Sequence, residues 1–407
     1  MQPPTQPRDS QHAIVMGAGI GGLTAALALG RRGWQVTVHE RAASLDPVGS
    51  GLGIAPNALR ALDGLGVGGE IRALAAVPGD GGLRRSTGRW LGHTSGEALA
   101  EVFGDTVAVI HRADMVRVLA DRLPDGVLRM GSTVEVLDPG SDQQPATVST
   151  STGQQRADLV VAADGIGSPT RRLLFPEHPG PRYSGFTAWR TVIPAAAAAI
   201  IGNVPIGETW GRGAVTGIMP LADGRIYLYA AALTPAGERA HDDEQAELAR
   251  RFGSWCAPLP QLIAAAEPEQ VLRNDVYEMA VPLPSFHRGR VALLGDAAHA
   301  MTPFLGQGAC QAIEDAVVLA SVMSPTESTK PTDPGNDLPG ALAAYSAARL
   351  PRTSMVVQRS RRVSRAVAIH SRPAVLLRDL GLALGGLLPE KVTARAVAPV
   401  FDWRPPA

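Results

Sequence analysis

Cysteine and lysine are both scarce in this 407-residue sequence. The two cysteines, Cys256 and Cys310, are too few for a disulfide framework and lack the spacing of metal ligands. We therefore expect both to be buried free thiols in a reducing compartment, which we take to be the cytoplasm. The nine histidines show no metal-site spacing and no G-x-S-x-G motif is present, so neither a metalloenzyme nor a hydrolase is indicated.

An excess of charge of either sign is also missing. Lys and Arg together number 38, as do Asp and Glu, which argues against binding to nucleic acid or to an anionic membrane. No apolar run approaches the length of a membrane span. Residues 1–11 are polar, rich in proline and without the apolar core of a signal peptide, so a loose tail is expected. The chain is long enough for two domains, which could be interleaved.

Glycine, by contrast, is abundant, and one cluster lies where a dinucleotide would need it. The sequence predicts a strand at Ala13–Met16, a G-x-G-x-x-G loop at Gly17–Gly22 and a helix at Leu23–Arg32. A second strand, Gln35–His39, ends in Glu40, which would bind the ribose of an adenosine. The glycines permit a tight turn, close approach to a pyrophosphate and close packing of helix on strand. This segment therefore predicts a dinucleotide site.

The same motif recurs at Gly64–Gly69. This second match follows a helical stretch, residues 56–63, rather than a strand, and no acidic residue stands at the right distance after it. We interpret it as a loop at the end of a helix.

Another segment, residues 158–172, places an acidic residue beside a glycine at the end of a strand. The apolar strand predicted over Arg156–Val161 leads to Asp164-Gly165, and Ser168-Pro169 then opens a short helix. A carboxylate at the carboxyl end of a strand, with glycine next to it, is typical of ligand contact in open α/β sheets.

A third segment, residues 289–315, has the same strand–loop–helix order. Val291–Leu294 predicts a buried strand, Gly295-Asp296 turns the chain, and a helix begins at Ala309. A helix that opens on two glycines presents bare N–H groups and a partial positive charge. Such an end can receive phosphate or the negative charge of a reduced flavin. An ordinary strand–loop–helix connection is the alternative when this segment is considered alone.

The middle of the chain has a different character. Residues 181–284 consist of short β-prone runs separated by turns, and they hold most of the Trp and Tyr residues taken together. We expect an inserted antiparallel sheet with a helix at Glu244–Trp255. The aromatic residues would suit a wall that faces an apolar substrate, and a plain β core is the alternative.

Four further predictions are local. They are a glycine-rich loop and a helix capped near Asn57 within residues 49–62, a hairpin turn at Ser141–Pro145, a helix that starts around Arg112, and a mobile surface loop at residues 324–338.

Taken together, the three segments resemble the fingerprints of FAD-dependent class A aromatic monooxygenases, the p-hydroxybenzoate-hydroxylase-like family. The likeness extends to PNALRAL at residues 56–62 and GQGACQAIEDA at residues 306–316, and it is nearest to the salicylate, 3-hydroxybenzoate and urate hydroxylase branch. It implies an α/β fold with a Rossmann-like FAD-binding domain of the GR2 type, an inserted antiparallel β-sheet substrate domain and a C-terminal helical segment. The implied divisions are residues 1–75, 106–180 and 286–365 for FAD, 76–105 and 181–285 for substrate, and 366–407 for the helical segment.

The resemblance also implies which residues would bind FAD. They are Gly17, Gly19, Gly22, Glu40, Arg41, Gly53, Arg112, Val134, Asp164, Gly165, Asp296, Gly306, Gln307 and Gly308. Among these, the first three glycines would hold the pyrophosphate, Arg112 a phosphate and Asp296 the ribityl chain. The Asp164-Gly165 pair would contact both FAD and the pyridine nucleotide, for which no separate domain is expected.

In enzymes of this kind NADPH or NADH reduces the flavin, O₂ forms a C4a-hydroperoxide, and its distal oxygen passes to an electron-rich substrate. Pro303 would line the peroxide side, and no side-chain nucleophile is required. The implied partners are O₂ and an aromatic or polycyclic small molecule, bound by a monomer or a homodimer. The candidate substrate contacts, each of which could instead be structural, are Arg190, Trp210, Arg212, Tyr227 and Phe304.

The sequence departs from this branch in one respect. Several of its phenol hydroxylases place a His or Arg on the substrate-facing strand to assist phenol deprotonation, whereas Ala214–Pro220 has neither. The difference favours a substrate that is already activated or is larger and less polar, as for a tailoring enzyme of secondary metabolism. A flavin reductase or dehydrogenase without oxygen insertion and a non-catalytic FAD-binding protein remain alternatives. A halogenase is disfavoured because Thr191 stands where its W-x-W-x-I-P motif needs tryptophan.

Overall fold

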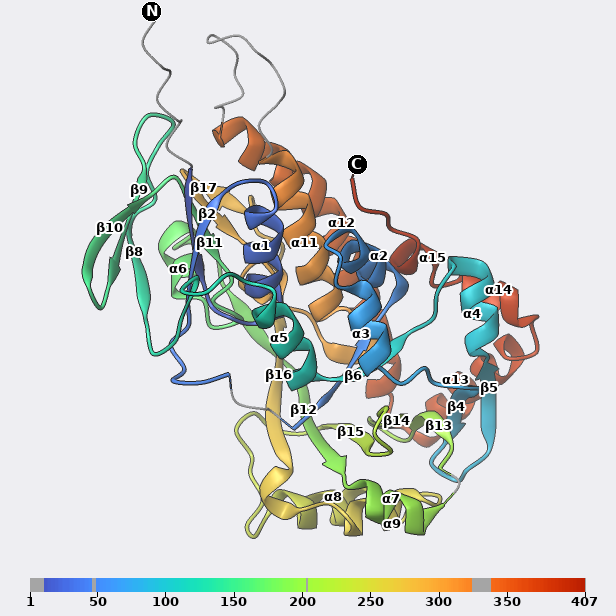
Figure 1. Ribbon diagram of the computed structural model, residues 1–407. Coiled ribbons are helices and arrows are strands. Elements are labelled where there is room, and N and C mark those ends of the chain that lie inside the picture. Colours follow the sequence, from blue (N-terminus) through green and yellow to red (C-terminus); the bar gives the residue numbers. More distant parts are fainter. Residues whose placement is uncertain (1–10, 46–48, 203, 324–337, 407) are drawn as a thin grey trace, which may run out of the picture.

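The computed structural model describes residues 11–45, 49–202, 204–323 and 338–406, which form a central sheet, a second large sheet and the helices around them (Figure 1). The tail predicted over residues 1–11 and the loop predicted over residues 324–338 lie outside the described residues, apart from the last residue of each.

The first sheet is built on the strand–glycine–helix unit of the N-terminal segment. Its order is β17-β18-β11-β1-β2-β7, and every neighbouring pair is parallel except β17 with β18. Parallel strands bring their carboxyl ends to one edge of the sheet, where open α/β sheets bind ligands. The strands predicted in all three segments are thereby placed side by side. Their bounds are β1 (His12–Met16), β2 (Gln35–His39), β7 (Leu128–Arg129), β11 (Leu159–Ala162), β17 (His287–Arg288) and β18 (Val291–Leu293).

The strand predicted over Arg156–Val161 is in fact two strands. β10 (Gly153–Ala157) belongs to a separate three-stranded sheet with β9 (Ala146–Thr150) and β8 (Val134–Asp138), whereas β11 belongs to the central sheet. The prediction is wrong because the chain changes partners at Asp158, whose carboxylate accepts the N–H of His12 at 2.9 Å. β8 and β9 are antiparallel neighbours, which confirms the hairpin predicted between them.

Helices α1 (Ile20–Gly30), α11 (Gly308–Val322) and α12 (Leu338–Ala368) lie side by side next to the central sheet (Figure 1). α1 begins at Ile20, three residues before its predicted start, so that the second half of the glycine motif belongs to the helix, and it ends two residues before its predicted end. α11 begins one residue before its predicted start. The second G-x-G-x-x-G match joins α2 (Pro56–Gly64) to α3 (Gly68–Leu74), which confirms the loop interpretation.

Residues 49–62 differ from the prediction in two ways. The glycine-rich part is not a loop, because β3 (Gly51–Ile54) pairs with β6 (Ala108–His111). Asn57 is not the cap of α2, whose N-cap is Ala55. Its side chain is instead fully buried, and its amide donates to Glu314 at 2.6 Å and to the residue just before α11.

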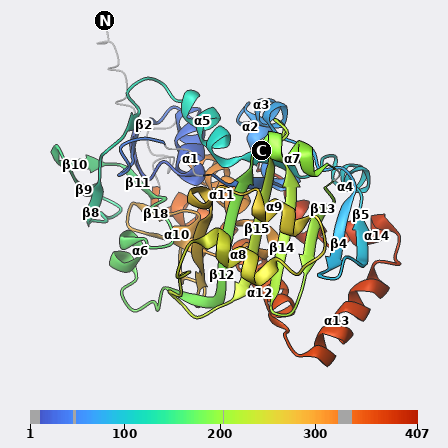
Figure 2. The ribbon, with the colours of Figure 1, turned by 90° about the horizontal axis from the view of Figure 1, so that it is seen from below.

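The predicted antiparallel sheet has seven strands in the order β16-β12-β15-β14-β13-β4-β5, and one pair, β13 with β4, is parallel. Helices α7 (Ala195–Ile201), α8 (Glu244–Phe252) and α9 (Leu259–Ala264) cover its outer face (Figure 2), and a cluster around Trp189 fills the space between. α8 ends at Phe252, three residues earlier than predicted, and Gly253 is its C-cap. The strands are β4 (Gly81–Arg85), β5 (Trp90–Thr94), β12 (Pro181–Ile193), β13 (Ile206–Trp210), β14 (Ala214–Pro220), β15 (Ile226–Leu233) and β16 (Leu272–Met279).

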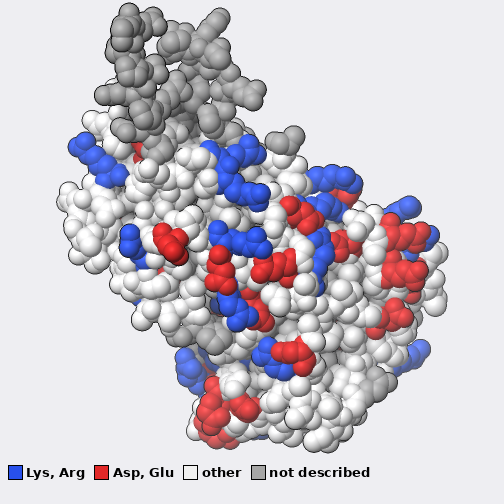
Figure 3. Space-filling view, in the orientation of Figure 1, with Lys and Arg blue, Asp and Glu red and all other residues white. Residues whose placement is uncertain are grey.

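The chain ends in helices α13 (Arg372–Gly385), α14 (Glu390–Arg395) and α15 (Ala398–Phe401), which confirms the C-terminal helical segment. α13 runs along the outside of the molecule (Figure 2), and α14 packs on α4 (Gly96–Phe103). Within the described parts of the chain, no helix combines the length and the apolarity needed to cross a bilayer. On the face seen in Figure 3 the basic and acidic side chains are interspersed.

A buried ionic network ties α11 to its neighbours. The Asp315 carboxylate accepts hydrogen bonds from the Gly295 N–H at 2.9 Å, from His299 Nε2 at 2.6 Å and from Arg349 Nε at 2.6 Å. Arg349 also donates to Glu314 at 2.6 Å. Burial alone would raise the pKa of Asp315, but His299 and Arg349 outweigh it and hold the pKa at about 2.

We expect Asp315→Asn to lower the free energy of unfolding by about 3–5 kcal/mol, because it leaves the buried Arg349 without one of its two carboxylates. Denaturant titration followed by circular dichroism measures this. Asp121→Asn, on the exposed end of α5 (Arg112–Asp121), is the control and should stay within about 0.5 kcal/mol. Because the pKa of Asp315 is depressed, the difference should be complete above about pH 4 and shrink as pH falls toward 2. A loss as small as that of the control would contradict the role of the network.

The two cysteines differ in exposure. Both are free, but only Cys310 is buried, and Cys256 is half-buried, so the prediction of two buried thiols is wrong for Cys256. Cys256 lies against the turn after β4, where its thiol contacts the carbonyl oxygen of Arg85. Burial raises the pKa of Cys310 to about 12.

At pH 8 we therefore expect a thiol reagent to modify Cys256 in the native protein and to reach Cys310 only after unfolding. Counting modified thiols before and after adding denaturant tests this. Cys256→Ser should abolish the fast reaction, and persistence of that reaction would show that Cys310 is accessible.

Candidate functional site

A large cavity lies between the carboxyl edge of the central sheet and the seven-stranded sheet. Its volume is about 1410 Å³. Small-molecule pockets usually measure about 300–1,000 Å³, so this cavity has room for more than one ligand. Its walls come from the ends of β1, β11 and β18, from β3, from the loop before α11 and from β12 to β15.

The glycine loop after β1 forms one wall. A side chain at Gly22 would collide with the backbone oxygen of Gly17, and one at Gly17, where φ is +102°, would lie 2.6 Å from the carbonyl oxygen of Ala163. Gly19, in contrast, meets nothing within 4 Å and lines the cavity. Two of the glycines thus let the loop pack, and the third leaves open space for a ligand, as a pyrophosphate cradle requires.

Glu40 lies directly behind this loop. Its carboxylate accepts the N–H groups of Ala18 at 2.8 Å and Ala42 at 2.9 Å, and its backbone oxygen accepts the N–H of Ser132. The structure therefore brings Glu40, Arg41 and the segment that leads to Val134 together beside the glycine loop. None of these three residues lines the cavity itself, and neither does Gly17.

Asp164 and Gly165 follow the end of β11. Asp164 Oδ2 accepts the N–H of Thr170 at 3.3 Å, and Ser168 caps α6 (Pro169–Leu174) as predicted. Asp164 Oδ1 is buried without a partner among the described residues, and Gly165 lines the cavity. Asp164 itself does not line the cavity, so its unpartnered oxygen is an available acceptor beside the cavity and not in its wall.

Arg112 and Asp296 bring opposite charges to the cavity wall. Arg112 is the first residue of α5, and within the described residues its guanidinium has no hydrogen-bond partner. Burial, with a contribution from nearby Arg190, lowers the pKa of Arg112, although arginine remains charged. Asp296 is enclosed by protein yet accessible from the cavity, and burial raises its pKa. An unpaired cation at a helix start fits a phosphate, and the carboxylate fits sugar hydroxyls.

The loop before α11 completes the cofactor side. Pro303, Phe304, Gly306, Gln307 and Gly308 all line the cavity. Gly308 is the first residue of a 15-residue helix, so the free N–H groups and the positive end of its dipole face the cavity. The amide oxygen of Gln307 accepts from Asn57 at 3.0 Å, and its Nε2 is buried without a partner among the described residues.

The residues predicted to contact substrate divide into two groups. Arg190, Tyr227 and Phe304 line the cavity. Trp210 does not, because it lies behind Glu208 under the guanidinium of Arg378. Arg212 does not either, because it is exposed and donates to the carbonyl oxygen of His370 at 2.7 Å. The structure thus corrects the expectation for Trp210 and Arg212 as cavity residues.

Tyr227 lies where the seven-stranded sheet meets β3, at the junction of the two sides of the cavity. Its ring lies on Gly51 of β3, where any side chain would collide with it, and Gly53 lines the same wall. The Tyr227 hydroxyl has no hydrogen-bond partner within the described residues, and burial raises its pKa to about 12. It is therefore a neutral hydroxyl that is free to bind a ligand.

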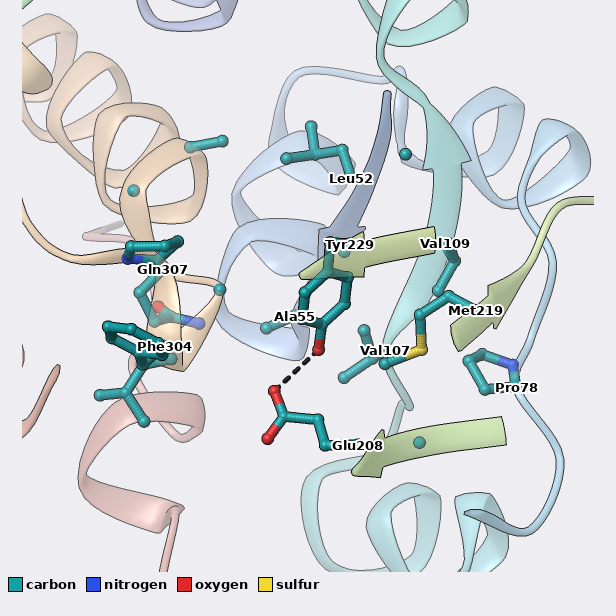
Figure 4. Close-up of a pocket in the computed structure, with 18 of the residues that line it drawn as sticks. Leu52, Ala55, Pro78, Val107, Val109, Glu208, Met219, Tyr229, Phe304 and Gln307 are labelled. Atoms are coloured by element: carbon teal, nitrogen blue, oxygen red, sulfur yellow. Dashed lines mark hydrogen bonds between the residues drawn. The ribbon is translucent and has the colours of Figure 1, made fainter. Parts of the chain in front are cut away.

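Sequence reasoning missed the pair of Glu208 and Tyr229. Both line the cavity, and the Tyr229 hydroxyl donates to Glu208 Oε1 at 2.7 Å (Figure 4). The only signal was a charged residue within a β-prone run, which is more often on a solvated face. Among the described residues there is no group of three or more His, Cys, Asp or Glu side chains that could hold a metal ion.

Comparison with known proteins agrees with this geometry. A family model described as an FAD binding domain matches residues 10–360. The chain is 38% identical to the aurachin C monooxygenase/isomerase of Stigmatella aurantiaca over 352 residues, or 86% of this chain and 88% of that protein. It is 33% identical to the FAD-dependent urate hydroxylase of Klebsiella pneumoniae over 362 residues, again 86% and 88%. The structure of Klebsiella pneumoniae HpxO complexed with FAD and uric acid is similar with a TM-score of 0.84 and 28% identity, covering 96% of each chain.

Two glycines of α1 allow a matched test of the cradle. Gly22→Ala is expected to displace the glycine loop, because the new methyl group would overlap Gly17. The affinity for FAD should therefore fall by at least about tenfold, and less FAD should be retained on purification. Gly30→Ala lies on the exposed end of the same helix with nothing within 4 Å, so it should keep FAD and gain up to about 1 kcal/mol in stability. Absorbance at 450 nm relative to 280 nm reports bound FAD. Equal FAD content in the two variants would contradict the cradle.

Proposed function

The chain belongs to the FAD binding domain family and is an FAD-dependent monooxygenase. On this premise we propose that it uses NADPH or NADH and O₂ to insert one oxygen atom into an aromatic or polycyclic small molecule. The observation that carries the proposal is that one cavity joins the glycine cradle to an apolar chamber lined by Tyr227 and Tyr229. A cofactor and a substrate can therefore meet in it without crossing solvent.

The chemistry that FAD supplies when bound is acceptance of hydride from the pyridine nucleotide and activation of O₂. The residues expected from the sequence would hold it: the Gly17–Gly22 loop at the pyrophosphate, Glu40 with Arg41 and Val134 at the adenosine, and Arg112 at a phosphate. Asp296 would accept hydrogen bonds from ribityl hydroxyls.

The N-terminus of α11 would stabilise negative charge on the reduced ring, because its free N–H groups and dipole point into the cavity. Gly53, Gly306, Gln307 and Gly308 would pass along the ring. Asp164 and Gly165 would contact both FAD and the pyridine nucleotide. Pro303 would border the space where oxygen reacts.

The chamber itself favours a largely apolar aromatic substrate. The side chains labelled in Figure 4 around it are mostly aliphatic or aromatic, including Leu52, Val109 and Met219, and they exclude water from the reacting atoms. Tyr227 can donate a hydrogen bond to a substrate oxygen, and Phe304 can pack on a ring. Relatives that act on aurachin C and on urate support an aromatic substrate class. A tailoring role on a polycyclic metabolite is consistent with the size of the cavity.

Oxygen insertion is tested with ¹⁸O₂. Protein with bound FAD, supplied with NADPH or NADH and a panel of aromatic acids, purines and polycyclic phenols, is expected to release a product that carries one ¹⁸O atom. Mass spectrometry of the product provides the readout. Oxidation of the nucleotide without label in any product would support a reductase or dehydrogenase instead. No nucleotide oxidation with any compound, despite bound FAD, would support a non-catalytic flavoprotein.

A further inference from the structure

Glu208, Gly217 and Tyr229 form one row across three neighbouring strands. Glu208 on β13 pairs with Gly217 on β14, and Gly217 pairs with Tyr229 on β15. In a sheet, residues in such a row project from the same face. The two outer side chains therefore stand on either side of a position that has none.

Gly217 makes the contact between them possible. A side chain at this position would overlap the Tyr229 ring and its hydroxyl. Because Gly217 has none, the Tyr229 ring leans across β14 and its hydroxyl reaches Glu208 Oε1 at 2.7 Å. The other oxygen, Oε2, accepts the indole N–H of Trp210 at 2.8 Å. Two donors from two strands thus hold the carboxyl group in one orientation.

The carboxyl group keeps unused acceptor capacity. Each carboxylate oxygen can accept two hydrogen bonds, and each has one within the described residues. No arginine, lysine or histidine in the described part of the chain pairs with Glu208. Burial raises the pKa of Glu208, and the hydrogen bonds from Trp210 and Tyr229 oppose that rise. A buried carboxyl group without a counter-charge is unfavourable unless a further donor reaches it.

The surroundings leave the cavity as the place for such a donor. In Figure 4 the Glu208 carboxyl group points into the space between Phe304 on one side and Val107, Met219 and Pro78 on the other. These neighbours offer no polar side chain that could satisfy it. The same space adjoins Pro303 and Gln307 of the cofactor wall.

We propose that Glu208 is the hydrogen-bond acceptor for a phenolic O–H or ring N–H group of the substrate, and that Tyr229 and Trp210 are the residues that position it. This proposal rests on the proposed function, since it concerns the substrate of that reaction. It names a substrate class: an aromatic ring system that carries an O–H or N–H donor on an otherwise apolar body.

The acceptor also has a chemical consequence. As the substrate O–H bond weakens, its proton moves toward a Glu208 oxygen and its electron pair stays on the substrate oxygen. The ring becomes more electron-rich and more reactive toward an electrophilic oxygen. The proton returns to the product oxygen afterwards, so no other reactant is consumed. Glu208 on β13 would thus assist deprotonation of the substrate, the role for which the neighbouring strand, Ala214–Pro220, offers no His or Arg.

Paired probes test the acceptor by binding alone. The pairs are 2-naphthol with 2-methoxynaphthalene and 4-hydroxyquinoline with its O-methyl ether, each titrated into the FAD-loaded protein and followed by the change in the flavin spectrum. A hydrogen bond to a charged acceptor corresponds to about tenfold to a hundredfold in affinity. We expect the donor of at least one pair to bind more tightly than its ether by that factor.

Three variants separate the roles. Glu208→Gln preserves the size of the side chain but replaces the carboxylate with a neutral amide oxygen, a weaker acceptor, so it should strongly reduce the preference for the donor while leaving the ether's affinity unchanged. Tyr229→Phe keeps the ring and should reduce the preference only in part, because Trp210 still holds the carboxyl group. Glu269→Gln, an exposed glutamate that does not line the cavity, is the control and should retain the full preference.

The outcomes distinguish this proposal from the proposed function. Equal binding of donor and ether to the wild type, a preference that is undiminished in Glu208→Gln, or no binding of any probe would overturn the acceptor role. If any of these occurs while ¹⁸O still enters a product, the monooxygenase stands and only the acceptor fails. If the preference depends on Glu208 but no compound is oxygenated, the acceptor site stands and the proposed reaction fails.

Discussion

The buried carboxylate of Asp315 is the constraint on which the site depends. It accepts hydrogen bonds from Gly295, His299 and Arg349, so one carboxylate on α11 holds the end of β18, the turn after it and α12 together. Removing a charge from water costs several kcal/mol unless it is paired. Separating these segments would therefore leave Asp315 or Arg349 buried without its partner. Asp296 is the next residue after that turn, and Gly308 begins the helix that carries Asp315, about two turns earlier. One network therefore positions both the carboxylate and the helix terminus that face the cavity.

The shape of the cavity walls depends on glycines, which have no side chain, at three positions of close packing. Gly22 allows the helix to approach the first strand, Gly51 leaves room for the ring of Tyr227, and Gly217 leaves room for Tyr229. Each of these three glycines lies where another segment passes close by, whereas a side chain at Gly19 would meet nothing within 4 Å, and Gly19, Gly21 and Gly22 all line the cavity. Glycine in a strand normally weakens it, so its use at Gly51 and Gly217 is explained by what packs against it.

The strand–glycine–helix unit at the expected cofactor site could be predicted because its signals are local. A strand, a turn of glycines and a helix each leave their own pattern within a few residues, and Gly17–Gly22 and Glu40 were found in this way. The secondary-structure predictions are wrong where strand pairing, and not the local sequence pattern, decides the structure. The sequence favours a loop where β3 forms, because Gly51 and Gly53 are typical of loops and the partner strand β6 is distant in sequence. The break at Asp158 was missed because apolar residues continue on both sides of it.

The substrate half could not be predicted, since its polar groups meet only through sheet order. Glu208 and Tyr229 belong to strands that are not neighbours, and their contact depends on β14 running between them with a glycine in the row. A lone glutamate in a β-prone run indicates a solvated face, and only the sheet reveals that this face is internal. The same reasoning explains why Trp210 and Arg212, which the sequence suggests as substrate contacts, do not line the cavity. The row of Glu208, Gly217 and Tyr229 depends on the glycine at its centre, because a side chain there would overlap the Tyr229 ring.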